Sequence, residues 1–89
     1  GPVFFLQAAA QLVFLVRLVE LALSMAGQGR WQDGAALLER AVPLVVNLSG
    51  DDREAAANAL KGFGARLGAL GYSAQAEKFR VTAQELTGS

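Results

Sequence analysis

Two short stretches decide the fold of this chain: GRWQDG at residues 29–34 and GYSAQA at residues 71–76. They lie 42 residues apart, and each separates two segments that have the apolar spacing of helices. Seven residues beyond each stretch stands an alanine, Ala41 or Ala83, with a leucine three positions later. A helix–turn–helix unit repeated at a fixed spacing is typical of stacked helical hairpins, which mostly bind other proteins.

The composition points to an excess of apolar surface. The 89 residues are enough for one small domain. Apolar residues make up 53% of the chain without glycine, whereas a typical soluble domain has about 45–50% even when glycine is counted. Charged residues make up 18%, against about 25% in a typical domain. A domain of this size cannot easily bury so much apolar surface by itself. We therefore expect a protein partner, or a homodimer, to cover part of it.

The residue types that carry most catalytic and metal chemistry are absent. The chain has no cysteine and no histidine, which removes thiolates and the commonest general base and metal ligand. Eight basic and eight acidic residues give zero net charge without any basic run, which argues against nucleic acid as a partner. Asp51, Asp52 and Glu54 are better explained as stabilising a helix N-terminus than as a cation site. We expect a non-enzymatic protein with no cofactor and no metal.

Residues 3–26 contain no glycine or proline and are rich in leucine and alanine, which predicts one long helix. One broad apolar face carries Phe4, Phe5, Ala8, Leu12, Leu15, Val16, Val19, Leu23 and Ala26. A second apolar line beside it consists of Phe14, Leu18, Leu21 and Met25. The core of a four-helix domain needs only one face, so we interpret the second line as an interface for a partner helix or a second copy. The alternative is a surface that the rest of a longer parent protein covers.

The same helix is long enough to cross a bilayer, which takes roughly 20 apolar residues. Arg17 and Glu20 lie inside it, and each costs about 2.5–3.5 kcal/mol at the centre of the hydrocarbon. No basic region precedes the apolar run, so a signal peptide also fits poorly. We therefore favour a soluble intracellular protein, with a membrane-associated helix beside a small soluble bundle as the alternative.

Glycines and a proline mark the limits of the second helix. Residues 27–29, GQG, end the first helix, and the second begins between Arg30 and Asp33. Pro43 removes a backbone donor and crowds the carbonyl four residues earlier, so we expect this helix to kink or end near Val42. Its buried stripe is predicted to be Ala35, Leu38, Ala41, Val42 and Val45.

Residues 47–52 form a turn by composition, after which Ser49 or Asp51 can cap the third helix. The predicted seam of that helix is Ala56, Leu60, Phe63, Leu67 and Leu70. Gly62, Gly64 and Gly68 weaken it, which indicates the close approach of a neighbouring helix. Gly71 closes the third helix and Ser73 is expected to cap the fourth. The fourth helix should bury Ala76, Phe79, Ala83 and Leu86.

The predicted fold is all-α, with four helices arranged as two antiparallel hairpins. Residues 1–2, Gly-Pro, resemble the remnant of an expression tag. Residues 3–89 then form a single domain, with residues 3–48 in the first hairpin and residues 49–89 in the second. The long apolar first helix makes dimerisation an expected property of this fold.

The two hairpins resemble the tetratricopeptide repeat. That family has a small residue in its first helix, Gly-x-aromatic-x-x-Ala at its turn and an alanine in its second helix. The first unit matches at Ala22, Met25, Gly29, Trp31, Gly34, Leu38 and Ala41. The second unit matches at Gly64, Leu67, Gly71, Ala76, Phe79 and Ala83. The spacing of 42 departs from the family's 34, and Gly34 and Ser73 depart from its usual alanine and aromatic residue.

The resemblance implies a protein-binding, adaptor or scaffold role, commonly through a groove lined by the first helix of each pair. The corresponding surface is Val16, Val19 and Leu23 in the first unit and Asn58, Lys61 and Ala65 in the second. Asn58 and Lys61 are similar to pairs with which some members hold a terminal carboxylate. The alternative for these two residues is an ordinary exposed helix face. A further alternative is a non-catalytic piece of a larger regulatory protein.

Overall fold

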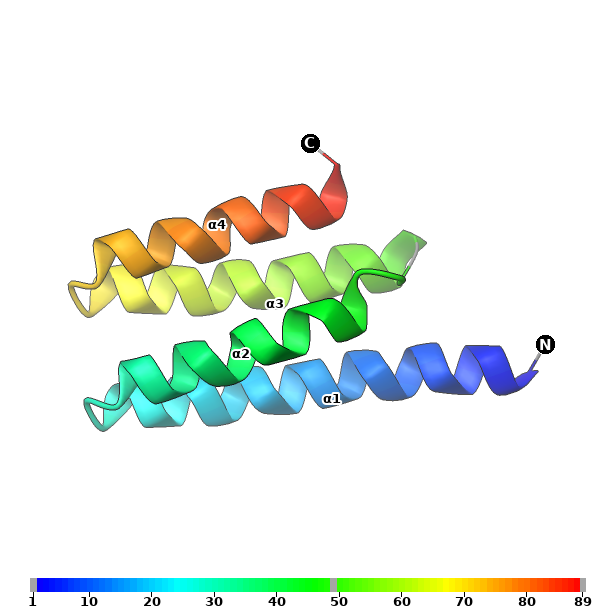
Figure 1. Ribbon diagram of the computed structural model, residues 1–89, viewed down its shortest axis with the longest axis horizontal. Coiled ribbons are helices and arrows are strands. Elements are labelled where there is room, and N and C mark those ends of the chain that lie inside the picture. Colours follow the sequence, from blue (N-terminus) through cyan, green and yellow to red (C-terminus); the bar gives the residue numbers. More distant parts are fainter. Residues whose placement is uncertain (1, 49, 89) are drawn as a thin grey trace.

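The computed structural model describes the backbone of residues 2–48 and 50–88, and the side chains of these ranges from residue 10 onward. Its helices are α1 (Pro2–Gly27), α2 (Trp31–Val45), α3 (Gly50–Ala69) and α4 (Ser73–Thr87), and the described residues contain no strand. The predicted all-α fold of four helices is confirmed. In Figure 1, α2 runs back along α1 and α4 runs back along α3, consistent with two hairpins.

The turn inside each hairpin has the same backbone structure. In the first, the Arg30 N–H donates to the Met25 carbonyl at 2.8 Å and the Gly29 N–H to the Ala26 carbonyl at 3.0 Å. The second turn contains the equivalent bonds 42 residues later. The Tyr72 N–H donates to the Leu67 carbonyl at 2.9 Å, and the Gly71 N–H donates to the Gly68 carbonyl at 3.0 Å. Both are Schellman turns, which need a residue with positive φ. Gly29 and Gly71 supply it, with φ of 83° and 98°.

The two helices of each hairpin approach closely at one pair of small residues. A Cβ atom added to Gly34 of α2 would lie 2.8 Å from the backbone oxygen of Ala22 in α1. A Cβ atom added to Gly64 of α3 would lie 3.1 Å from the backbone oxygen of Ala76 in α4. These pairs occupy equivalent positions 42 residues apart, with glycine and alanine exchanged between the helices. Of the three glycines predicted to mark close packing, Gly64 does so. The prediction is wrong for Gly62, where an added Cβ atom would meet no atom within 4 Å, and Gly68 makes only an ordinary contact with the Ala76 side chain.

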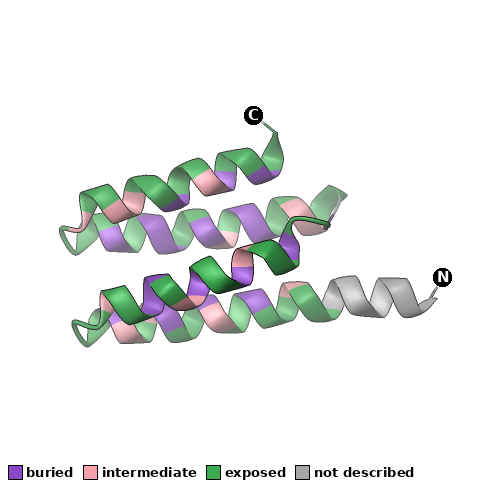
Figure 2. Ribbon diagram, in the orientation of Figure 1, coloured by how far each residue is buried: buried purple, intermediate pink, exposed green. Residues whose placement is uncertain are grey.

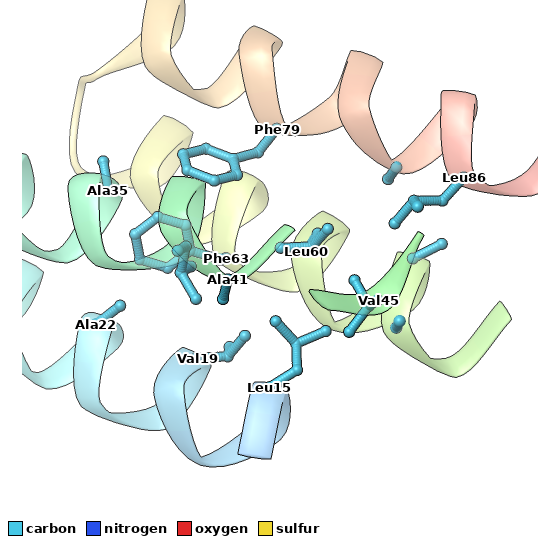
Figure 3. Packing of buried hydrophobic residues seen from close by; sticks show 14 of the residues in the cluster. Leu15, Val19, Ala22, Ala35, Ala41, Val45, Leu60, Phe63, Phe79 and Leu86 are labelled. Atoms are coloured by element: carbon cyan, nitrogen blue, oxygen red, sulfur yellow. The ribbon is translucent and has the colours of Figure 1, made fainter. Parts of the chain in front are cut away.

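All four helices contribute to one hydrophobic core (Figure 3). Leu15 and Val19 of α1 face Leu60 and Phe63 of α3, and the Phe63 ring meets the edge of Phe79 at 4.9 Å. Buried positions alternate with exposed ones along each described helix (Figure 2). The fully buried side chains with the largest volume are Phe63, Leu15, Leu38, Leu60, Leu67 and Val45. The predicted buried positions of α2 are confirmed at Ala35, Leu38, Ala41 and Val45, whereas Val42 is only partly buried.

Helix α2 passes through Pro43. Of the two expected outcomes, a kink or an end near Val42, the end does not occur, because the helix continues to Val45. The proline ring is exposed, so its missing donor is on the solvent side, whereas Val45 and Leu48 are buried in the core. Burial of these two apolar side chains outweighs the loss of one helical hydrogen bond.

Three further local predictions are wrong. Asp51 lies inside α3, which begins at Gly50, and therefore does not cap that helix. Ser73 is the first helical residue of α4 and not its cap; the capping position belongs to Tyr72, whose side chain makes no cap hydrogen bond. Tyr72 is held there by the Schellman turn and by its ring, which lies 4.5 Å from that of Trp31. Leu70 follows the end of α3 and is 45% exposed, so it does not extend the buried seam. Ser49, the other predicted cap, lies outside the described residues, as do the side chains of Phe4, Phe5 and Ala8.

Candidate interaction surfaces

The first hairpin carries an exposed apolar surface that we term the rear surface. On α1 it includes Phe14 and Leu21, which are 52% and 51% exposed, and the half-buried Leu18 and Met25. On α2 it continues with the half-buried Leu37 and the exposed Leu44. Of the predicted second line of α1, Phe14 and Leu21 are therefore exposed, whereas Leu18 packs partly against the core. Leu37 and Leu44 are additions that sequence reasoning did not include.

The equivalent surface of the second hairpin is buried. Phe14, Leu18, Leu21, Met25, Leu37 and Leu44 correspond, 42 residues later, to Ala56, Leu60, Phe63, Leu67, Phe79 and Leu86. Every one of these second-hairpin residues is at most 4% exposed. They pack partly within their own hairpin and partly against the first one, since α3 lies along α1 (Figure 1). The rear positions of a hairpin are therefore the ones by which it stacks on a neighbour.

The opposite side of each hairpin, the front surface, shows the reverse pattern. In the first hairpin it is apolar and buried beneath the second: Val19, Ala26, Ala35, Leu38 and Val45. The equivalent residues of the second hairpin are all exposed: Lys61, Gly68, Glu77, Arg80 and Thr87. Most of this set is polar, and it borders a shallow groove of about 350 Å³ between α3 and α4. One end of the molecule is therefore apolar and the other polar.

An ion pair lies on the front surface of the second hairpin. The Arg80 Nε donates to the Glu77 Oε2 at 2.8 Å, and a second bond joins Arg80 Nη2 to Glu77 Oε1. This hydrogen bonding lowers the pKa of the Glu77 carboxyl below its ordinary value and raises the pKa of Arg80. Both groups are solvent-exposed, so the pair satisfies charge at the surface and adds little stability.

Asn58 and Lys61 lie on exposed turns of α3 and line a second groove of about 550 Å³ near the C-terminal end of α4. Arg53 and Glu54 line the same groove, and the Arg53 Nε donates to the Leu86 carbonyl oxygen. The predicted pair therefore shares its groove with one further cation and one anion. Sequence reasoning missed Arg53, because its place in this groove depends on where α4 ends.

The predicted groove-lining residues of α1 are not equally accessible. Val16 is exposed and Leu23 is half-buried, whereas Val19 is only 7% exposed and belongs to the core. The physical reason is that the second hairpin covers this side of α1. Val19 is equivalent to Lys61, which is open to solvent only because no described element stacks on α3 there. The Val19 side chain is thus not available to a partner.

Arg17 and Glu20 lie on the solvent side of α1. Their side chains are 76% and 62% exposed, and their nearest charged atoms are 3.9 Å apart.

Residues 10–27 of α1 are long and apolar enough to cross a membrane by length and composition, and only 22% of this segment is buried in the fold. Among the described residues, no cluster of acidic side chains could hold a metal ion.

Comparisons with protein-family models, with curated proteins and with solved structures found no match to this chain. The two surfaces themselves, one apolar and one polar, are therefore the observations from which a function can be inferred.

Proposed function

We propose that this chain is a non-enzymatic protein-interaction module that binds a helical partner through its rear surface. One observation carries the proposal: six exposed or half-buried apolar residues of the first hairpin occupy the positions at which the second hairpin is fully packed. The chain thus presents a stacking surface without a described neighbour on it.

The energetics favour covering this surface. Full burial of one large apolar side chain is worth about 1.5–3 kcal/mol relative to full exposure. Phe14, Leu21 and Leu44 are each about half exposed, so completing their burial supplies a few kcal/mol before the costs of association.

The module is proposed to be tetratricopeptide-like. Support for this class comes from the two identical turns and from the pair of small residues at which the helices of each hairpin approach. Repeat arrays of this kind stack by nearest-neighbour contacts, and an end that faces solvent is usually polar. The front surface of the second hairpin fits a solvent-facing end, and the rear surface of the first does not.

The test replaces Leu21 with glutamate and compares it with Leu70→Glu, a leucine of similar exposure outside the rear surface. Circular dichroism establishes that both variants keep the helical content of the parent chain. Light scattering then gives the molar mass, and the immobilised chain is tested for retention of protein partners. We expect Leu21→Glu to abolish self-association or retention, and Leu70→Glu to preserve it. Equal behaviour of all three proteins in both assays refutes the proposal.

A bilayer is the competing occupant, because the apolar window of α1 is mostly unburied. Against it stand Arg17 and Glu20, each of which costs about 2.5–3.5 kcal/mol at the centre of a bilayer. Co-sedimentation of the chain with lipid vesicles decides between the two. Vesicle binding that Leu21→Glu abolishes, without any protein association, would assign the rear surface to lipid.

A further inference from the structure

We draw no further inference here: the strongest candidate, the exposed apolar surface of the first hairpin at Val13, Phe14 and Val16 of α1 and Leu44 and Val46 of α2, carries nothing beyond the proposed function, because nothing in the structure shows what covers it.

Discussion

The close approach of α1 and α2 at Gly34 gives the sharpest prediction about stability. Alanine at position 34 would place its Cβ atom 2.8 Å from the Ala22 carbonyl oxygen, closer than folded proteins tolerate. Because the neighbouring atom belongs to the backbone, the two helices must separate. Overpacking of this kind costs about 1–3 kcal/mol. The replacement of glycine by alanine within a helix returns about 0.8–1.0 kcal/mol.

Gly62 is the matched control. It also lies inside a helix, but an added Cβ atom there meets no atom within 4 Å. Gly62→Ala should therefore raise the free energy of unfolding by up to about 1 kcal/mol, while Gly34→Ala lowers it by up to about 2 kcal/mol. The propensity gain is common to both, so the difference between the two variants measures the steric cost alone, about 1–3 kcal/mol.

Thermal unfolding followed by circular dichroism at one fixed protein concentration measures this difference. For a domain of this size, 1 kcal/mol shifts the midpoint by about 4–8 °C. The midpoint of Gly34→Ala should therefore lie at least about 4 °C below that of Gly62→Ala. If Gly34→Ala stabilises the protein as much as Gly62→Ala does, the helices are not in contact at this position and the reasoning fails.

Two other perturbations follow from local features. Pro43→Ala restores a donor to the interior of α2 at a solvent-exposed site, so the free energy of unfolding should rise by about 1–3 kcal/mol in denaturant titrations; a decrease would show that the proline ring contributes packing. Arg80→Gln removes the hydrogen bonds that lower the pKa of Glu77, so a carboxyl NMR titration should show that pKa rising towards its ordinary value. Because the folded-state pKa is lowered, the pair stabilises the fold above the pKa of the unfolded chain, and this contribution disappears as pH falls through the folded-state value. An unchanged Glu77 pKa in the variant would contradict this assignment.

The parts of the fold that could be predicted from sequence are those that a local rule determines and tertiary packing does not change. Gly29 and Gly71 stand at positions that require positive φ, and no other residue type adopts that conformation as readily. The seam through Leu60, Phe63 and Leu67 follows directly from helical spacing. Pro43 alone left open whether α2 ends or kinks near Val42. The helix continues to Val45, whose burial is a tertiary effect that local propensity does not include.

The candidate surfaces were predictable only in part. The line from Phe14 to Met25 could be recognised from sequence because it is a second apolar face on α1, and the core needs only one face of that helix. Leu44 could not be assigned to it from sequence, since its accessibility depends on where α2 lies relative to α1. Val19 and Lys61 were expected to line one accessible surface, and this was wrong, because Val19 is buried. Which of the two is buried depends on the order in which the hairpins stack.

The exchange of glycine and alanine between the two hairpins also bears on how the chain chooses its helix pairs during folding. The four helices come from two similar units, so α1 could in principle pair with α4, and α3 with α2. The first wrong pair would bring Ala22 against Ala76, two methyl groups at a contact built for one. The second would bring Gly64 against Gly34 and leave a void. Only the two native pairings place one methyl group at the contact, whereas each wrong pairing has one too many or one too few. This difference helps to discriminate between helices whose patterns are otherwise alike.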